Sequence, residues 1–467
     1  MGSKVKLGEL LSVLTDYHAN GAYKKLKENV VLLDKPDFAV MIRTTNFEQE
    51  DFTNNLKYIS KHAYSFLAKS KVYPNDIIMN KIANAGSSYL MPNLKVPVSL
   101  AMNLFLLRVD AAKANPIYVY LYLRVNEAYV KSFANGSVTK TITKDAVRNL
   151  EIELPSRNIQ DRIAEQFICI NDKITLNREI NQTLEQMAQT LFKSWFMDFD
   201  PVIDNALEAG FFEQDLAFSE ELLSRVELRK TVRESNGFKP LPEDIRQLFP
   251  DAFEKCSEPA LGLGGWVPKG WFYSSIYESM DIIFGAPFKS SLFNELGEGK
   301  PIVRIRDLKT GAPQVFSVEL HPKKTQIIAG DIIVGMDAEF RATIWSGDDA
   351  YLNQRLFLAK PKGTNISNLF VKYSLAPLLA IEEMAQVGTT VAHLGKKDID
   401  KFNIILPNSS VLAAYKKQSD DFLRKIVVGM RENNTLTKLR DTLLPKLISG
   451  ELSLDDIKID LPEETLI

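Results

Sequence analysis

Two long stretches of the chain carry apolar residues at alternating steps of three and four positions. The first stretch follows Ile159 and uses Ile163, Phe167, Ile170, Ile174, Asn177, Ile180, Leu184, Met187, Leu191 and Trp195. The second uses Tyr415, Phe422, Ile426, Gly429, Asn433, Leu436, Leu439, Leu443 and Leu447. Such steps are typical of a coiled-coil seam rather than of a short helix on a globular core. The pattern predicts long helices over residues 156–199 and 409–449.

The two predicted seams belong to one chain, so we expect the helices to pack on each other. Each seam contains one asparagine, Asn177 or Asn433, and a polar residue at such a position fixes the register of a coiled coil. Burial of each helix in a separate domain is the alternative that the pattern leaves open.

Short β-type runs separated by turn residues precede each helical stretch. They are residues 38–42, 76–79 and 103–109 in the first region, and 301–305, 331–334 and 355–359 in the second. Residues 118–123 and 369–373 have the pattern of helices that pack on a sheet. The sequence therefore predicts two mixed α/β modules.

The two regions repeat at a constant offset. Gly136 and Gly388 stand 252 positions apart, and so do Pro155 and Pro407. Two equivalent module-and-helix units pack most simply as a pseudo-two-fold pair with antiparallel helices. The predicted fold class is α+β, with two pseudo-symmetric modules joined by two long antiparallel coiled-coil helices. The predicted segments are the first module (1–155), first helix (156–199), an acidic linker insertion (200–265), second module (266–408), second helix (409–449) and an acidic tail (450–467).

Charge is distributed unevenly along the 467 residues. The net charge is −2, but residues 200–260 carry −7 and residues 450–467 carry −5, which leaves +10 on the modules and helices. That sign fits contact with a polyanion, although ordinary surface charge explains it equally well. No apolar run approaches the length of a membrane span. The two cysteines, Cys169 and Cys256, lie far apart in sequence, so we expect a reduced, cytoplasmic protein.

Motifs of enzymatic chemistry are missing from the sequence. The nearest match to an adenine methyltransferase motif, residues 115–118 (Asn-Pro-Ile-Tyr), lacks the second proline. Residues 297–301 do not form a phosphate loop, because proline replaces the required Ser or Thr. The four histidines have no metal-ligand spacing. We therefore expect no catalytic residues, no cofactor and no metal on this chain.

Several sequence features together resemble the specificity subunit of type I restriction–modification enzymes over essentially the whole chain. They are the Asp-Ile-Ile strands at 76–78 and 331–333, the loops at 136–139 and 388–391, the Ile-Glu-Leu-Pro and Ile-Ile-Leu-Pro runs before each long helix, and the stretches 184–202 and 443–452. The Pro-Leu-Pro that is usual after the module is replaced by Pro155-Ser156-Arg157 and by Pro407-Asn408-Ser409.

The resemblance implies two target recognition domains that each read half of a bipartite double-stranded DNA sequence. It implies two methyltransferase subunits as partners, with translocase–nuclease restriction subunits joining through them. S-adenosylmethionine, ATP and Mg²⁺ then belong to those partners, and this chain is non-catalytic. A coiled-coil scaffold that binds protein only is the rival hypothesis, and a single-chain modification enzyme is disfavoured by the missing motifs.

The loops at 80–88 and 335–341 match in position but differ in sequence, as expected of two surfaces that recognise different targets. Arg and Asn side chains address base edges, and Lys and Thr more often hold phosphates. The predicted DNA contacts are Arg43, Thr44, Asn46, Asn80, Lys81, Ser88, Thr139 and Lys140 in the first module, and Arg304, Arg306, Asp337, Arg341, Thr390, His393 and Lys396 in the second.

Overall fold

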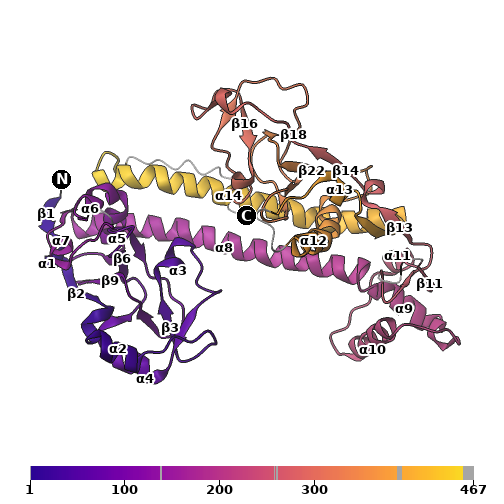
Figure 1. Cartoon of the computed structure of the whole chain (residues 1–467), viewed down its shortest axis with the longest axis horizontal. Helices are drawn as coiled ribbons and strands as arrows, with labels where there is room; N and C mark the ends of the chain where they lie inside the picture. Colours follow the sequence, from indigo (N-terminus) through magenta and orange to yellow (C-terminus); the bar gives the residue numbers. More distant parts are fainter. Residues whose placement is uncertain (1, 137–138, 257, 259–260, 387–391, 456–467) are drawn as a thin grey trace. The chain divides into compact units, whose positions relative to one another are not determined.

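The computed structural model describes residues 2–136, 139–256, 258, 261–386 and 392–455. By their contacts these residues form two compact units, the first of residues 1–172 with 437–467 and the second of residues 173–436. Each unit contains one module and parts of both long helices. The mixed α/β modules and the long helices confirm the predicted fold class (Figure 1).

The first unit is built on two four-stranded sheets. One is antiparallel in the order β2 (Leu11–Asp16), β9 (Leu104–Val109), β6 (Ile77–Asn80), β7 (Ser88–Leu90). The other has the order β4 (Lys57–Ile59), β3 (Ala39–Ile42), β8 (Val98–Leu100), β5 (Lys71–Val72), with β3 and β8 parallel. A separate antiparallel pair joins β1 (Ser3–Lys6) to β10 (Glu151–Leu154). The short helices are α1 (Leu7–Leu10), α2 (Tyr23–Asn29), α3 (Thr44–Glu48), α4 (Lys61–Phe66), α6 (Glu127–Ser132) and α7 (Lys144–Arg148).

Strand β6 is buried on both faces, which explains its uninterrupted apolar sequence. Ile77 and Met79 belong to the cluster around α5 (Pro116–Val125), whereas Ile78 belongs to the cluster shared with the β3 sheet. Successive side chains of a strand point to opposite faces, so a central strand covered twice needs apolar residues at every position. The Asn115 side chain caps α5 by accepting hydrogen bonds from the amides of Ile117 and Tyr118.

The second unit repeats this architecture. Its antiparallel sheet has the order β14 (Met280–Phe284), β22 (Leu356–Pro361), β19 (Ile332–Gly335), β20 (Ala342–Ile344). A five-stranded sheet follows the order β15 (Phe293–Asn294), β17 (Phe316–Ser317), β16 (Lys300–Val303), β21 (Ala350–Leu352), β18 (Gln326–Ile327). Strands β13 (Phe272–Ser275) and β23 (Asn403–Leu406) pair as β1 and β10 do. Helix α12 (Asn368–Ala385) corresponds to α5, and α13 (Lys396–Ile399) to α7.

Helices α8 (Arg157–Phe196) and α14 (Ser409–Ser449) are each continuous (Figure 1). Within the second unit Asn177 of α8 donates to Asn433 of α14 at 3.0 Å, and the rings of Phe192 and Tyr415 lie 6.2 Å apart. Higher residue numbers on α8 thus meet lower numbers on α14, which confirms the antiparallel arrangement.

The buried face of α8 differs from the predicted seam at two positions. Ile180 and Met187 are 46% and 50% exposed, so their assignment to the seam is wrong. Their neighbours Asn181 and Ala188 lie on the packed face instead, with Ala188 fully buried. A polar and a small residue occupy the seam because the helices come close there: Gly429 of α14 packs directly against Asn181.

Residues 200–256 form a folded segment of the second unit. It contains α9 (Asp200–Glu208), α10 (Glu220–Glu234), α11 (Glu243–Arg246) and β11 (Phe253–Lys255), which pairs with β12 (Trp266–Pro268). Arg225, Arg229 and Arg233 on α10 form ion pairs with acidic residues on α9, one helical turn after another. From composition alone, these acidic side chains would be expected on a solvated surface; in the structure they pair with arginines of the same segment.

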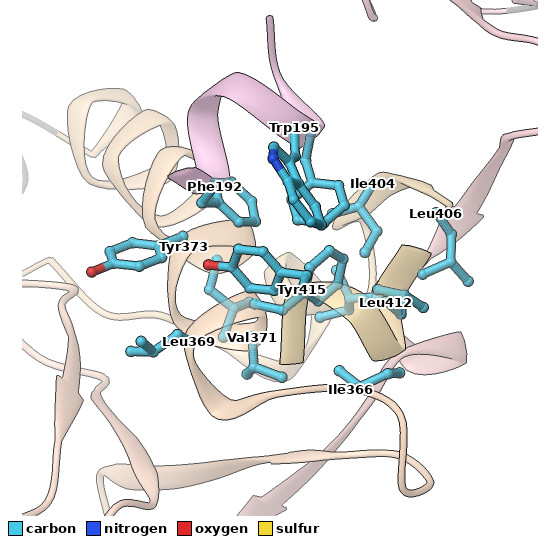
Figure 2. Close-up of a cluster of buried hydrophobic side chains, with 14 of the residues drawn as sticks. Phe192, Trp195, Ile366, Leu369, Val371, Tyr373, Ile404, Leu406, Leu412 and Tyr415 are labelled. Carbon is cyan, nitrogen blue, oxygen red and sulfur yellow. The ribbon is translucent and has the colours of Figure 1, made fainter. Parts of the chain in front are cut away.

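A large apolar cluster joins this segment to the second module and to both long helices. Figure 2 shows Trp195 and Tyr415 among its side chains, together with Leu369 and Tyr373 of α12. Trp195 and Tyr415 are 1% and 0% exposed, so the end of α8 and the start of α14 are fixed within the core of this unit.

Candidate nucleic-acid interface

The loop that follows β6 has the same backbone hydrogen bonds as the loop that follows β19. The Lys81 amide donates to the Asn103 carbonyl at 2.8 Å, and the Met336 amide donates to the Arg355 carbonyl at 3.0 Å. The carbonyl of Lys81 accepts from Ile142 at 3.0 Å, as that of Met336 does from Leu394 at 2.8 Å. Each loop is thereby hydrogen-bonded to the residue directly before β9 or β22 and to the segment before α7 or α13.

The backbone conformations match as well. Ala83 and Ala338 both have φ of +66°, and each amide donates to the segment that precedes α7 or α13. Asn103 and Arg355, which stand 252 positions apart, both have φ of +69°. Residues other than glycine rarely adopt these values. The two modules therefore have the same backbone framework at this place.

The side chains carried by this framework differ between the modules. Isolated bridges pair Ile82 with Thr141 in the first module and Asp337 with His393 in the second. Together with Asn103 and Arg355, they define three matched positions. The first module has an apolar, a hydroxyl and an amide side chain there, and the second has a carboxylate, an imidazole and a guanidinium.

In the second module these three side chains form one polar cluster. Arg355 Nη1 donates to both carboxylate oxygens of Asp337, at 2.9 and 3.0 Å. His393 Nδ1 lies 2.7 Å from Asp337 Oδ1. The side chains of Arg355 and His393 are 56% and 47% exposed, whereas that of Asp337 is 24% exposed. A partly buried carboxylate thus orients two exposed donors.

In the first module the charged groups are Lys81, on the loop itself, and Asp16 and Lys144, which lie beside it. Asp16, at the end of β2, pairs with Lys81 at 3.2 Å and with Lys144 at 3.0 Å. Burial acts to raise the pKa of Asp16, but the hydrogen bonds from Lys144 and Lys81 outweigh it and hold that pKa below its ordinary value. The two lysines against one carboxylate leave a net positive charge next to the loop.

A second recurring feature is the turn after β3 and after β16. The Arg43 amide donates to Asn46 Oδ1 at 3.0 Å, and the Arg304 amide donates to Asp307 Oδ2 at 2.9 Å. Arg304 Nε also pairs with Asp307, at 3.2 Å. Arg43 Nη2 donates to the Asn55 carbonyl at 2.7 Å. Both arginines are half-buried and are held at the start of a short helical turn.

The structure separates the predicted contacts by accessibility. The exposed ones are Thr139, Lys140, Arg306, Arg341, His393 and Lys396, and the half-buried ones are Arg43, Thr44, Lys81, Arg304 and Asp337. Asn46, Asn80 and Ser88 are 4%, 1% and 8% exposed, and Asn46 uses both ends of its amide within its own turn. Buried side chains do not reach a ligand on the surface, so these three drop out of the candidate interface. Thr390 lies outside the described residues.

Sequence reasoning missed Asn103, Lys144 and Arg355. The signal for Asn103 and Arg355 was present, because both directly precede the repeated Leu-Phe at 104–105 and 356–357. It was overlooked because these residues were assigned to strands, whereas β9 and β22 begin one residue later, at Leu104 and Leu356.

Two further searches covered the described residues only. No group of three or more His, Cys, Asp or Glu side chains is placed to hold a metal ion there. In the same ranges, none of the helices combines the length and the apolar character that crossing a bilayer requires.

Comparison with known proteins gives matches over both halves of the chain. A family model described as the type I restriction modification DNA specificity domain matches residues 3–186 and 268–426. The type I restriction enzyme HindI specificity subunit of Haemophilus influenzae is 26% identical over an alignment of 417 residues that covers 82% of this chain and 88% of that protein. The MjaIX specificity subunit of Methanocaldococcus jannaschii is 22% identical over 74% of this chain and 71% of its own length.

One solved structure supports the fold. The S subunit of a type I restriction–modification system from M. genitalium covers 96% of each chain with a TM-score of 0.52 at 14% identity. The family model and the two curated relatives support the DNA-specificity hypothesis and not the protein-only coiled-coil scaffold. The family model leaves residues 187–267 unmatched, and that gap contains the folded segment with α9, α10 and α11.

Proposed function

The chain belongs to the family of the type I restriction modification DNA specificity domain, and we propose that it is the non-catalytic subunit that reads a bipartite double-stranded DNA target. Each module reads one half of the target. The sequence read by the first module is independent of the sequence read by the second.

The observation that carries this proposal is the identical framework with different side chains. Lys81 and Met336 make the same two backbone hydrogen bonds, yet the matched side chains around them differ in charge and in hydrogen-bonding capacity. Base edges in the major groove are distinguished by patterns of donors and acceptors. A constant framework with variable polar groups suits two readers of unlike sequence.

Phosphate contacts position the protein and base contacts specify the sequence. In the first module, Lys81, Lys144 and Lys140 supply positive charge around the loop, and Thr139 is exposed beside them. In the second module, Arg306, Arg341 and Lys396 are exposed. The lysines hold phosphates in this proposal, and Asn103 in the first module and the matched Arg355 in the second face the bases.

The partners in this proposal are two methyltransferase subunits, with restriction subunits joining through them. S-adenosylmethionine, ATP and Mg²⁺ act on those subunits, and this chain holds no cofactor. The complex works in the cytoplasm together with the DNA that it reads. Purified chain incubated alone with S-adenosylmethionine and DNA should transfer no methyl group, and methylation by the chain alone would contradict the proposal.

A module exchange tests independent reading. Residues 1–155 are replaced by the matching module of a relative, and the chimaera is produced with its methyltransferase partner. Sequencing of methylated positions in the host DNA should show one half-site changed and the other retained. A change in both half-sites would mean that the modules form one composite surface. A protein-only scaffold predicts instead that the methylated sequence does not depend on this chain.

A further inference from the structure

The geometry of the second module points to Arg355 as a specificity-determining residue: we infer that it reads a guanine in the half-site of this module, with Asp337 as its positioning residue. The inference rests on the proposed function and deepens it, because it names one base class and the side chain that selects it.

The backbone of Arg355 has a conformation that is unfavourable for arginine. Its φ of +69° lies in the left-handed region, which asparagine tolerates better than arginine does. The matched residue of the first module is asparagine, Asn103, with the same φ. An arginine kept in an unfavourable backbone conformation at an exposed place is typical of a functional site.

One nitrogen of the Arg355 guanidinium is bound by Asp337, and the other two are free within the described residues. Nη1 donates to both oxygens of Asp337, and Asp337 is itself fixed by His393. Among the described residues, Nε and Nη2 of Arg355 have no partner. The Arg355 side chain as a whole is 56% exposed. The guanidinium therefore combines an orientation that Asp337 holds with two donor nitrogens that, among the described residues, are left free for a ligand.

That combination matches guanine better than any other base. Guanine presents two acceptors, N7 and O6, to the major groove, and a guanidinium pairs with both at once. Adenine, thymine and cytosine each present a donor or a methyl group where guanine has one of its acceptors. Both oxygens of Asp337 already accept from Arg355, and Oδ1 also contacts His393, so we assign Asp337 the role of fixing the arginine rather than of accepting from a base.

The test uses the full-length chain produced with its methyltransferase partner. The main variant is Arg355→Asn, since asparagine occupies the matched position 103 and accepts the left-handed backbone. Arg355→Lys keeps the charge without the planar pair of donors. Asp337→Asn keeps the shape of the positioning residue without its charge. Lys239→Asn is the charge control, because Lys239 is an exposed residue outside both modules.

The measurements are the methylated motif and the melting temperature of each variant. Arg355→Asn should relax the preference for G·C at one base pair of one half-site by about 10-fold or more, leave the other half-site unchanged and leave Tm unchanged or higher. Arg355→Lys should also relax that base pair, and Asp337→Asn should do so less strongly. Lys239→Asn should preserve the motif.

Two outcomes would overturn the inference. If Arg355→Asn lowers Tm and preserves the motif, the arginine serves the fold alone. If the relaxed base pair is not G·C, the base assignment is wrong. In both cases a bipartite motif from the wild-type complex still supports the proposed function, so the failures of the two proposals are distinguishable.

Discussion

Asn181 and Asn433 make the same hydrogen bond in opposite directions between α8 and α14. Asn181 Nδ2 donates to the Ile426 carbonyl, and Asn433 Nδ2 donates to the Ile174 carbonyl, both at 3.3 Å. The two asparagines are 252 positions apart, and so are the two carbonyls. This reciprocity is a local pseudo-two-fold relation between α8 and α14 within the second unit.

The symmetry is broken one turn away. Asn177 donates to Asn433 Oδ1 at 3.0 Å, but the residue that matches Asn177 on α14 is Gly429. Asn181 Oδ1 is consequently buried and, within the described residues, accepts no hydrogen bond. Specific polar pairs of this kind fix the register between helices at some cost in stability.

Gly429 and Asn181 should be energetically coupled. A Cβ on Gly429 would lie 2.6 Å from Asn181 Oδ1, so Gly429→Ala forces Asn181 to move away from the Ile426 carbonyl. In a helix, Gly→Ala otherwise gains up to about 1 kcal/mol. That gain should be about 1 kcal/mol larger in an Asn181→Ala background than in the wild type. Denaturant unfolding of the four proteins measures the difference, and additive effects would contradict the packing described here.

Tyr415→Phe should leave the free energy of unfolding unchanged or raise it by about 1 kcal/mol. The Tyr415 hydroxyl is buried in the cluster of Figure 2 and, in the described part of the chain, has no hydrogen-bond partner. Burial raises its pKa above the ordinary value, so the hydroxyl stays neutral. A buried polar group without a partner costs about 1–3 kcal/mol. Tyr373→Phe is the matched control.

The control should behave in the opposite way. The Tyr373 hydroxyl donates to the Glu185 carbonyl at 3.1 Å, so its removal should cost about 1 kcal/mol. Thermal unfolding distinguishes the two variants. A loss of stability for Tyr415→Phe as large as that for Tyr373→Phe would show that the Tyr415 hydroxyl is paired in solution.

Ile174 and Ile180 should respond differently to truncation, although both fit the apolar pattern of the sequence. Ile174 is 3% exposed and Ile180 is 46% exposed. Ile174→Ala should cost about 2–5 kcal/mol of unfolding free energy through lost burial and a cavity. Ile180→Ala should change it by less than about 0.5 kcal/mol, as usual at an exposed position. Equal losses would place Ile180 in the seam after all.

Asp16 should stabilise the first module at neutral pH and lose that effect in acid. Its pKa is lower in the folded chain than the value of about 3.9 that an unfolded aspartate has. Its contribution is therefore complete above about pH 4 and is lost as the pH falls through the lower folded value. Asp16→Asn should cost about 1–3 kcal/mol at pH 7, because Lys81 and Lys144 lose their common partner.

The control for this prediction is Asp145→Asn. Asp145 is 85% exposed and pairs with Arg148 on its own helix, so the substitution should cost less than about 0.5 kcal/mol at any pH. Urea unfolding at pH 7 and pH 3 compares the variants with the wild type. A difference between Asp16→Asn and the wild type that is as large at pH 3 as at pH 7 would exclude the carboxylate as its source.

The sequence by itself determined the repeat, both long helices and the buried strands. Hydrophobic spacing reports these features because burial of a whole face requires apolar residues at the period of the element. Strand β6 is an example, since Ile77, Ile78 and Met79 are all fully buried. The pattern was less reliable along α8, where it selected Ile180 over the polar Asn181 that lies on the packed face.

The tertiary structure alone decided which polar side chains are available at the surface. Asn46 and Asn80 look like base-reading residues in the sequence, yet both are buried, Asn46 within a helix-capping turn and Asn80 at the end of β6. Arg355 looks like the first residue of a strand, yet it is held on Asp337 from a loop 18 positions earlier. A carboxylate positions a guanidinium only if the two groups are close together in the folded chain. The spacing of hydrophobic residues along the sequence does not indicate that distance.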